Sequence, residues 1–107
     1  FHIGLPRRPG IDEPDEKPDA IVCGTDMLAI GQRYLLENGY RIPQDVAVTG
    51  YDNISISSMV FPSLSTMAQP IHEMGTAAAD ILFKKIENNS YNKSLLLQSE
   101  FISRDST

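Results

Sequence analysis

Two short apolar runs constrain the fold of this chain more than any other feature. Residues 20–23 are Ala-Ile-Val-Cys and residues 46–49 are Val-Ala-Val-Thr, and a glycine follows each run. Continuous runs of this length that are rich in β-branched residues are typical of strands with both faces covered. The pattern predicts two buried strands of one sheet.

The segment between the two runs predicts a helix. Its apolar residues recur at helical spacing, Thr25 or Asp26 can cap its start, and Gly39 can end it. A helix that joins two buried strands is most simply the right-handed crossover of a parallel pair. We therefore expect an α/β fold with a parallel sheet in a three-layer α/β/α arrangement. The apolar positions of this helix are Leu28, Gly31, Leu35 and Leu36.

A second helix should begin after Pro70, because proline is favoured in the first helical turn. An apolar stripe with a period near 3.6 follows, and Asn88-Asn89 ends it. Residues 95–97 and 101–102 then predict a last strand. The stripe consists of Ile71, Met74, Ala78, Ile81, Leu82 and Ile86.

The N-terminal part has the composition of a linker. Residues 6–18 contain four prolines and four acidic residues, which favours an exposed, irregular segment over a packed element. We treat residues 1–17 as a linker or unassigned stub and residues 18–107 as the folded part. A chain of 107 residues has room for one domain or a piece of one.

Charge and cysteine content argue against several classes of function. Fourteen acidic and nine basic residues give a net charge of −5, and the basic residues do not cluster, so this segment should not hold nucleic acid by itself. The single cysteine, Cys23, cannot form a disulfide within the chain and fits a reducing, cytoplasmic location. No stretch approaches the roughly 18 apolar residues that span a bilayer, and the sequence does not open on a signal-peptide pattern.

Catalytic motifs and metal-site spacings are not found in the sequence. Neither the nucleophile elbow Gly-x-Ser-x-Gly nor the P-loop ending Gly-Lys-Ser/Thr occurs. His2 and His72 are isolated, and the neighbouring Glu73 fits a solvated helix start better than a zinc ligand. We therefore expect neither an enzyme nor a metal or cofactor site.

Polar residues follow both predicted strands. Thr25-Asp26 come after the first strand, and Tyr51-Asp52-Asn53 come after the second. In an open parallel sheet, ligands bind beyond the carboxyl ends of the strands, so both groups should meet at one edge. Carboxylates and amides pair with adjacent hydroxyls, and an aromatic face can cover a sugar ring. The combination favours a polyol ligand over a phosphate.

Each of these residues also has a purely structural interpretation. Thr, Asp and Asn are common wherever a strand turns into a helix. Asp26 should chiefly cap the helix that follows it. Asp52-Asn53 could equally form an Asx turn, and Tyr51 could belong to the core. Spacing alone leaves these alternatives open.

Four segments carry a family resemblance. They are residues 18–31 (PDAIVCGTDMLAIG), 42–53 (IPQDVAVTGYDN), 62–70 (PSLSTMAQP) and 101–107 (FISRDST). In this order and spacing they resemble the LacI/GalR family of transcriptional regulators, over residues 18–107. The resemblance implies a core like that of type I periplasmic binding proteins, with two α/β subdomains and the effector between them. Only the C-terminal part is present here, so the three-layer fold should be incomplete.

By this resemblance, residues 18–69 belong to the C-terminal subdomain, and the helix after Pro70 belongs to the N-terminal subdomain. The last strand then crosses back. The usual partner of that helix would be absent, so we expect its apolar stripe to find cover by swapping, oligomerisation or rearranged packing.

The resemblance also implies functional residues. Asp52 matches the position that binds effector hydroxyls or a base, and Gln69 matches a pocket-lining position near the crossover. Thr25 stands where the family often has a ligand-binding asparagine, which leaves one amide fewer in the cleft. Together with their neighbours, the predicted ligand-binding set is Asp52, Thr25, Gln69, Asp26, Tyr51 and Asn53.

The function that follows is effector binding and dimerisation within a DNA-binding regulator, with a sugar or related polyol as effector. Segments 27–34 and 56–61 match the family's dimer-forming surface, although both could be ordinary core. Operator DNA would be bound only through a helix-turn-helix headpiece that this chain lacks. The alternative is the solute-binding protein of a sugar transporter, which shares the fold. A flavodoxin-like enzyme is a third interpretation, but no cofactor loop or nucleophile supports it.

Overall fold

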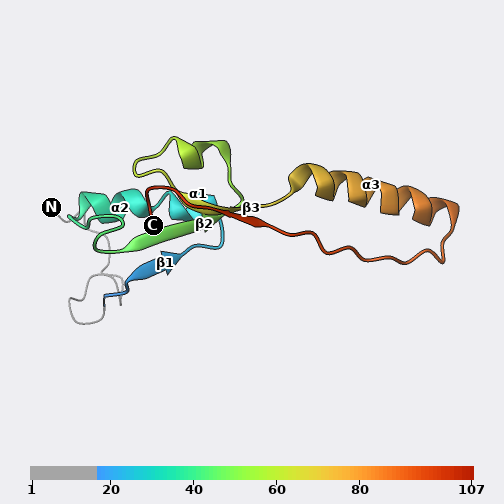
Figure 1. The fold of residues 1–107 in the computed structure, drawn as a ribbon, viewed down its shortest axis with the longest axis horizontal. Helices are drawn as coiled ribbons and strands as arrows, with labels where there is room; N and C mark the ends of the chain where they lie inside the picture. The colour runs from blue at the N-terminus through green and yellow to red at the C-terminus, as the bar shows by residue number, and fades with distance from the viewer. Residues whose placement is uncertain (1–16) are drawn as a thin grey trace.

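Figure 1 shows the fold in a computed structural model, which describes residues 17–107. The linker expected over residues 1–17 lies, except for Lys17, outside the described residues. The two predicted strands and the helix after Pro70 are confirmed. In chain order the elements are β1 (Ala20–Val22), α1 (Asp26–Ala29), α2 (Gln32–Glu37), β2 (Ala47–Tyr51), the 3-10 helix η1 (Ser55–Ser58), β3 (Ser65–Ala68), α3 (Ile71–Glu87) and β4 (Glu100–Ile102).

The strands form one sheet in the order β1-β2-β3-β4. β2 is parallel to both β1 and β3, with Thr49 opposite Ser65, whereas β4 is antiparallel to β3. The predicted parallel pair is thus confirmed, and α1 and α2 form its crossover. The last strand returns to the sheet beside β3.

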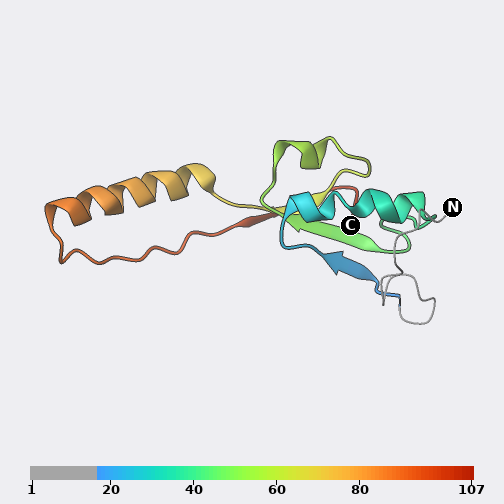
Figure 2. The same cartoon turned by 180° about the vertical axis from the view of Figure 1, so that it is seen from behind.

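Helices α1 and α2 lie over one face of the sheet (Figures 1 and 2). Along β2, Val48 and Gly50 are buried, whereas Ala47, Thr49 and Tyr51 on the alternate face keep part of their exposure. The described residues therefore supply the sheet and one helical layer of the three expected. The core consists of Ala29, Leu35, Ile42, Val46, Val48 and Leu64.

The crossover helix is interrupted, which corrects the single helix expected there. α1 ends at Ala29 and α2 begins at Gln32. Between them, the backbone N–H of Gly31 bonds to the carbonyl of Leu28, three residues back, where an α-helix would use the fourth. A Cβ at position 31 would lie only 2.9 Å from that carbonyl oxygen, so the tight turn favours glycine. Leu28 itself is 68% exposed and does not join the core.

Helix α3 projects away from the sheet, and residues 88–99 return from its far end (Figure 1). Its extent and its end at Asn88 are as predicted. No residue of α3 is buried, and the whole molecule measures 62 × 25 × 22 Å. The apolar stripe of α3 is therefore largely exposed, with Phe83 added to the predicted residues. Among residues 17–107, none of the helices combines the length and the apolar character needed to cross a membrane.

The last strand is shorter than predicted. β4 contains only Glu100–Ile102, and it pairs with β3 from Thr66 to Ala68. A strand needs a neighbour to accept and donate its backbone hydrogen bonds. Because β3 ends at Ala68, residues 95–97 have no strand to pair with and stay outside the sheet.

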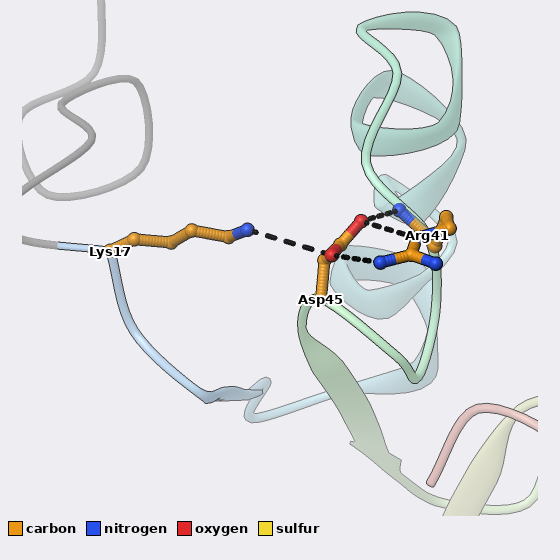
Figure 3. Close-up of polar contacts among 3 residues, drawn as sticks. All are labelled: Lys17, Arg41 and Asp45. Carbon is orange, nitrogen blue, oxygen red and sulfur yellow. Dashed lines mark hydrogen bonds and ion pairs between the residues drawn. The ribbon is translucent and has the colours of Figure 1, made fainter.

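A charged cluster fixes the turn before β2 (Figure 3). The guanidinium of Arg41 donates to the two carboxylate oxygens of Asp45 at 3.1 and 3.0 Å, and the backbone N–H of Arg41 donates to the same carboxylate at 2.7 Å. Nζ of Lys17 lies 3.9 Å from Asp45. The hydrogen bonds from Arg41 lower the pKa of Asp45 to about 2, from its ordinary 3.8.

Candidate functional site

Thr25 and Asp26 stand where the chain leaves β1 and enters α1. Oγ1 of Thr25 accepts a hydrogen bond from the backbone N–H of Leu28 at 3.3 Å, so Thr25 is the N-cap of α1. The expectation that Asp26 chiefly caps this helix is therefore wrong. The extended backbone of Thr25 and the helical backbone of the residues after it place the cap one residue earlier.

The carboxylate of Asp26 instead joins three parts of the sheet edge. Asp26 is fully buried. Its Oδ1 accepts from Oγ1 of Thr66 at 2.6 Å, and its Oδ2 accepts from the backbone N–H of Ile54 at 2.9 Å. Both oxygens are thus engaged within the protein. The geometry gives Asp26 a role in holding the edge together, behind any surface that a ligand could touch.

The turn after β2 has an unusual backbone. Asp52 and Asn53 have φ values of 118° and 54°, a region that Asp and Asn enter more readily than most residues. The turn is held from β3, because the N–H of Asp52 donates to the carbonyl of Met67 at 2.9 Å and the N–H of Asn53 donates to Oγ1 of Thr66 at 3.3 Å. This conformation ends β2 and places the side chain of Asp52 beside the end of β3.

Asp52 and Gln69 are brought together at the carboxyl ends of β2 and β3. Nε2 of Gln69 donates to Oδ1 of Asp52 at 2.7 Å, and both side chains are half-buried. Among residues 17–107, Oδ2 of Asp52 has no hydrogen-bond partner. The pair therefore presents a carboxylate oxygen that is oriented by its neighbour and still open to a donor.

Tyr51 and Asn53 bond to residues on either side of β4. The hydroxyl of Tyr51 lies 3.2 Å from Oγ of Ser99, and Oδ1 of Asn53 accepts from Nη2 of Arg104 at 2.8 Å. The predicted set thus divides into three groups: the central pair Asp52 and Gln69, the helix cap Thr25, and residues that bond to distant parts of the chain. The last group consists of Asp26, Tyr51 and Asn53.

Arg104 is a residue of this edge that the sequence did not single out. Its Nη1 donates to Oγ of Ser57 and to the carbonyl of Leu64, each at 2.9 Å, in addition to the bond that Nη2 makes to Asn53. A lone arginine after the last strand has the local pattern of a solvated charge. The available signal was its place in the closing segment FISRDST.

An apolar groove lies between α2 on one side and η1 with the loop that follows it on the other. Its volume is about 660 Å³. Ile56 is 46% exposed, and Met59 and Phe61 are 76% and 87% exposed. The groove contains residues of both segments that were matched to a dimer-forming surface. Its lining residues are Ile30, Gln32, Arg33, Leu36, Glu37, Ile56, Val60 and Phe61.

The sheet edge offers hydrogen-bonding groups for a ligand. Within the described part of the chain, no three His, Cys, Asp or Glu side chains are grouped so that they could hold a metal ion. The thiol of Cys23, just after β1, is partly buried, and this burial raises its pKa and disfavours the thiolate. The arrangement is suited to accepting hydrogen bonds from a ligand at Asp52.

Comparison with known proteins places the chain in a family. Residues 4–107 match the periplasmic binding protein-like domain. The chain belongs to this family. It is 39% identical over 84 residues to the HTH-type transcriptional repressor PurR of Vibrio atlanticus, which covers 78% of this chain and 25% of PurR. It is 36% identical over 92 residues to the ribose operon repressor of Haemophilus influenzae, which covers 84% of this chain and 28% of that repressor.

The fold of this chain is also similar to that of a repressor of known structure. The lac repressor dimer bound to operator and the anti-inducer ONPF matches 87% of this chain and 33% of its own, with a TM-score of 0.79 and 29% identity. The α/β fold of the periplasmic binding protein type is thus confirmed. The LacI/GalR resemblance is confirmed over the transporter alternative, since these relatives are transcriptional repressors. This chain spans between a quarter and a third of their length.

Proposed function

We propose that this chain supplies one wall of the effector cleft, and a subunit interface, of a cytoplasmic DNA-binding regulator. The effector is a sugar or related polyol, the chain has no catalytic role, and operator DNA is bound by a helix-turn-helix headpiece outside these 107 residues. The observation that carries the proposal is the Asp52–Gln69 pair at the carboxyl edge of the sheet. This is the place where open parallel sheets bind ligands.

The chemistry of the pair favours a ligand with hydroxyl groups. Gln69 holds one oxygen of Asp52 and leaves the other as an acceptor, while the amide oxygen of Gln69 is a second acceptor. Adjacent hydroxyls of a polyol donate to two such acceptors at once. An anionic ligand would meet the negative charge of Asp52, so phosphate fits this point poorly.

The pair also lies where the chain crosses between the sheet and α3. Gln69 leads from β3 into α3, and Ser99, which bonds to Tyr51, leads back into β4. A ligand held at Asp52 would contact the base of this crossing and favour one setting of α3 relative to the sheet. The setting would in turn change effector affinity, because such coupling is reciprocal.

We assign the subunit contact to the groove beside η1. Ile56 and Phe61 in its wall, together with the exposed Met59 between them in sequence, form an apolar surface of the kind that protein partners cover. A second copy of the chain is the partner we propose, which gives a homodimer. The support is the groove together with the similarity to a lac repressor that is described as a dimer.

The site is tested by titrating the full-length protein with D-ribose, D-glucose, cellobiose and adenine in a calorimeter. At least one of the sugars should bind, and Asp52→Ala should weaken that binding by about 100-fold, because a charge-assisted acceptor is lost. Asp80→Ala is the control, since Asp80 is an exposed carboxylate that bonds only to Lys84 on α3. It should bind the sugar as the unmodified protein does.

Two results would contradict the proposal. Unchanged sugar affinity in Asp52→Ala, with circular dichroism like that of the unmodified protein, would remove Asp52 from the site. Binding of adenine with no binding of any sugar would show that the edge recognises a base, and the polyol assignment would then be wrong.

A further inference from the structure

The guanidinium of Arg104 touches three parts of the chain that are far apart in sequence. It donates to Asn53 in the turn after β2, to Ser57 in η1, and to the carbonyl of Leu64 just before β3. These contacts lie between 40 and 51 residues from Arg104 along the chain. One side chain therefore joins the effector edge, the groove segment and the sheet.

The backbone of Arg104 is itself fixed on β3. Its N–H donates to Oγ of Ser65 at 2.7 Å, and its carbonyl accepts from the same hydroxyl at 3.2 Å. Ser65 is fully buried, and its own N–H donates to Oγ of Ser106 at 2.8 Å. The guanidinium thus extends from an anchored point and can impose its geometry on its partners.

Ser57 connects Arg104 to the wall of the groove. It is fully buried, its Oγ donates to the carbonyl of Ile54 at 2.6 Å, and its backbone carbonyl accepts from the N–H of Leu64 at 2.8 Å. Its neighbour Ile56 lines the groove. The position of η1, and with it part of the groove wall, thus depends on the hydroxyl that Arg104 holds.

We propose that Arg104 is the positioning residue that fixes the Asn53 turn and η1 in one arrangement, and so links the effector edge to the groove. This inference rests on the proposed function, which assigns effector binding to the sheet edge and the subunit contact to the groove. Arginine suits the role because its planar guanidinium aims several N–H donors in fixed directions. Lysine could reach one acceptor at a time and could not hold both segments in a set relation.

The experiment uses Arg104→Gln and Arg104→Lys in the full-length protein, with Arg41→Gln as the matched control. The guanidinium of Arg41 makes two hydrogen bonds to Asp45, and its backbone N–H makes a third. Arg41 lies before β2 and is not among the residues that line the groove. Two quantities are measured for each protein: the dimer dissociation constant by sedimentation, and hydrogen exchange of the backbone amides of residues 53–58.

Arg104→Gln should raise both the dimer dissociation constant and the exchange rate of residues 53–58 by about tenfold, the effect of losing charge-assisted hydrogen bonds. Arg104→Lys should also raise both quantities, but by less than Arg104→Gln does. Arg41→Gln should leave both unchanged even where it lowers the unfolding midpoint. If Arg104 had a purely structural role, Arg104→Gln would lower the unfolding midpoint, as Arg41→Gln does, and would leave the dimer dissociation constant and the exchange rate unchanged. That result would overturn the inference.

A double-mutant cycle with Asn53→Ala separates the inference from the proposed function. If the guanidinium acts through the turn, Asn53→Ala should change exchange at residues 54–58 in the unmodified protein and add little in Arg104→Gln. Fully additive effects would overturn the link between the two segments. A protein that stays monomeric would refute the proposed dimer, while the exchange data would still decide whether Arg104 positions the turn.

Discussion

A side chain at Gly50 would run into the carboxylate of Asp26. A Cβ there would overlap Oδ1 of Asp26 and lie 3.1 Å from both Cα of Asp26 and Cδ2 of Leu64. The missing side chain lets the carboxylate lie against β2, where it reaches Thr66 and Ile54. The glycine that follows the second apolar run therefore leaves room for the buried carboxylate.

Gly50→Ala should therefore destabilise the protein by about 2 kcal/mol, the usual scale for overpacking a filled site. The measurement is urea unfolding followed by circular dichroism. Gly75→Ala is the control, because a Cβ there meets nothing within 4 Å and alanine favours a helix interior. Equal stability of the two variants would mean that the Asp26 carboxylate can move aside at no cost.

Asp26→Asn should cost about 2 to 3 kcal/mol of unfolding free energy, since hydrogen bonds to a buried charged group are among the stronger ones. An amide offers one acceptor oxygen to the two donors, the hydroxyl of Thr66 and the N–H of Ile54. Its NH₂ group would face one of them. Thr66→Ser keeps a hydroxyl for Asp26 and should lose much less stability in the same unfolding experiment. If Asp26→Asn were as stable as the unmodified protein, the three-way contact would not support the edge.

The sequence predicted local structure well because its signals are local. The β-branched runs, Pro70 and Asn88 act on their own neighbours, and the strands and helix they indicate are found in place. The edge residues were predicted in the right location, since β1 and β2 are parallel. The two apolar runs predict where polar side chains gather, because the carboxyl ends of parallel strands meet at one edge of the sheet.

The partners of those side chains could not be predicted, because they come from distant parts of the chain. Asp26 bonds to residues 28 and 40 positions away, which made it resemble an ordinary cap in the sequence. Arg104 reaches Asn53 across 51 positions. The interruption at Gly31 depends on one carbonyl contact that helical spacing does not reveal.

The Asp45–Arg41 contact predicts a pH effect in the acid range. The folded pKa of Asp45 is lowered to about 2 by Arg41, so its stabilisation is present above the ordinary pKa of 3.8 and is lost as the pH falls toward 2. The difference in unfolding midpoint between the unmodified protein and Asp45→Asn should therefore shrink between pH 4 and pH 2. The effect should be modest, and weaker in high salt, because the pair is at the surface. A constant difference from pH 6 to pH 2 would contradict the assignment.

The exposed helix α3 should behave as a separate, weakly held unit. None of its residues is buried, so at low protein concentration its amides should exchange through local opening, far faster than those of β2. Leu82→Ser and Phe83→Ser, on exposed positions of α3, should leave the unfolding of the sheet unchanged, whereas Val48→Ser in the core should lower its midpoint sharply. Hydrogen exchange with mass spectrometry gives the rates for both segments. Equal protection of α3 and β2 in dilute solution would mean that α3 is covered, and protection that grows with concentration would identify another copy of the chain as the cover.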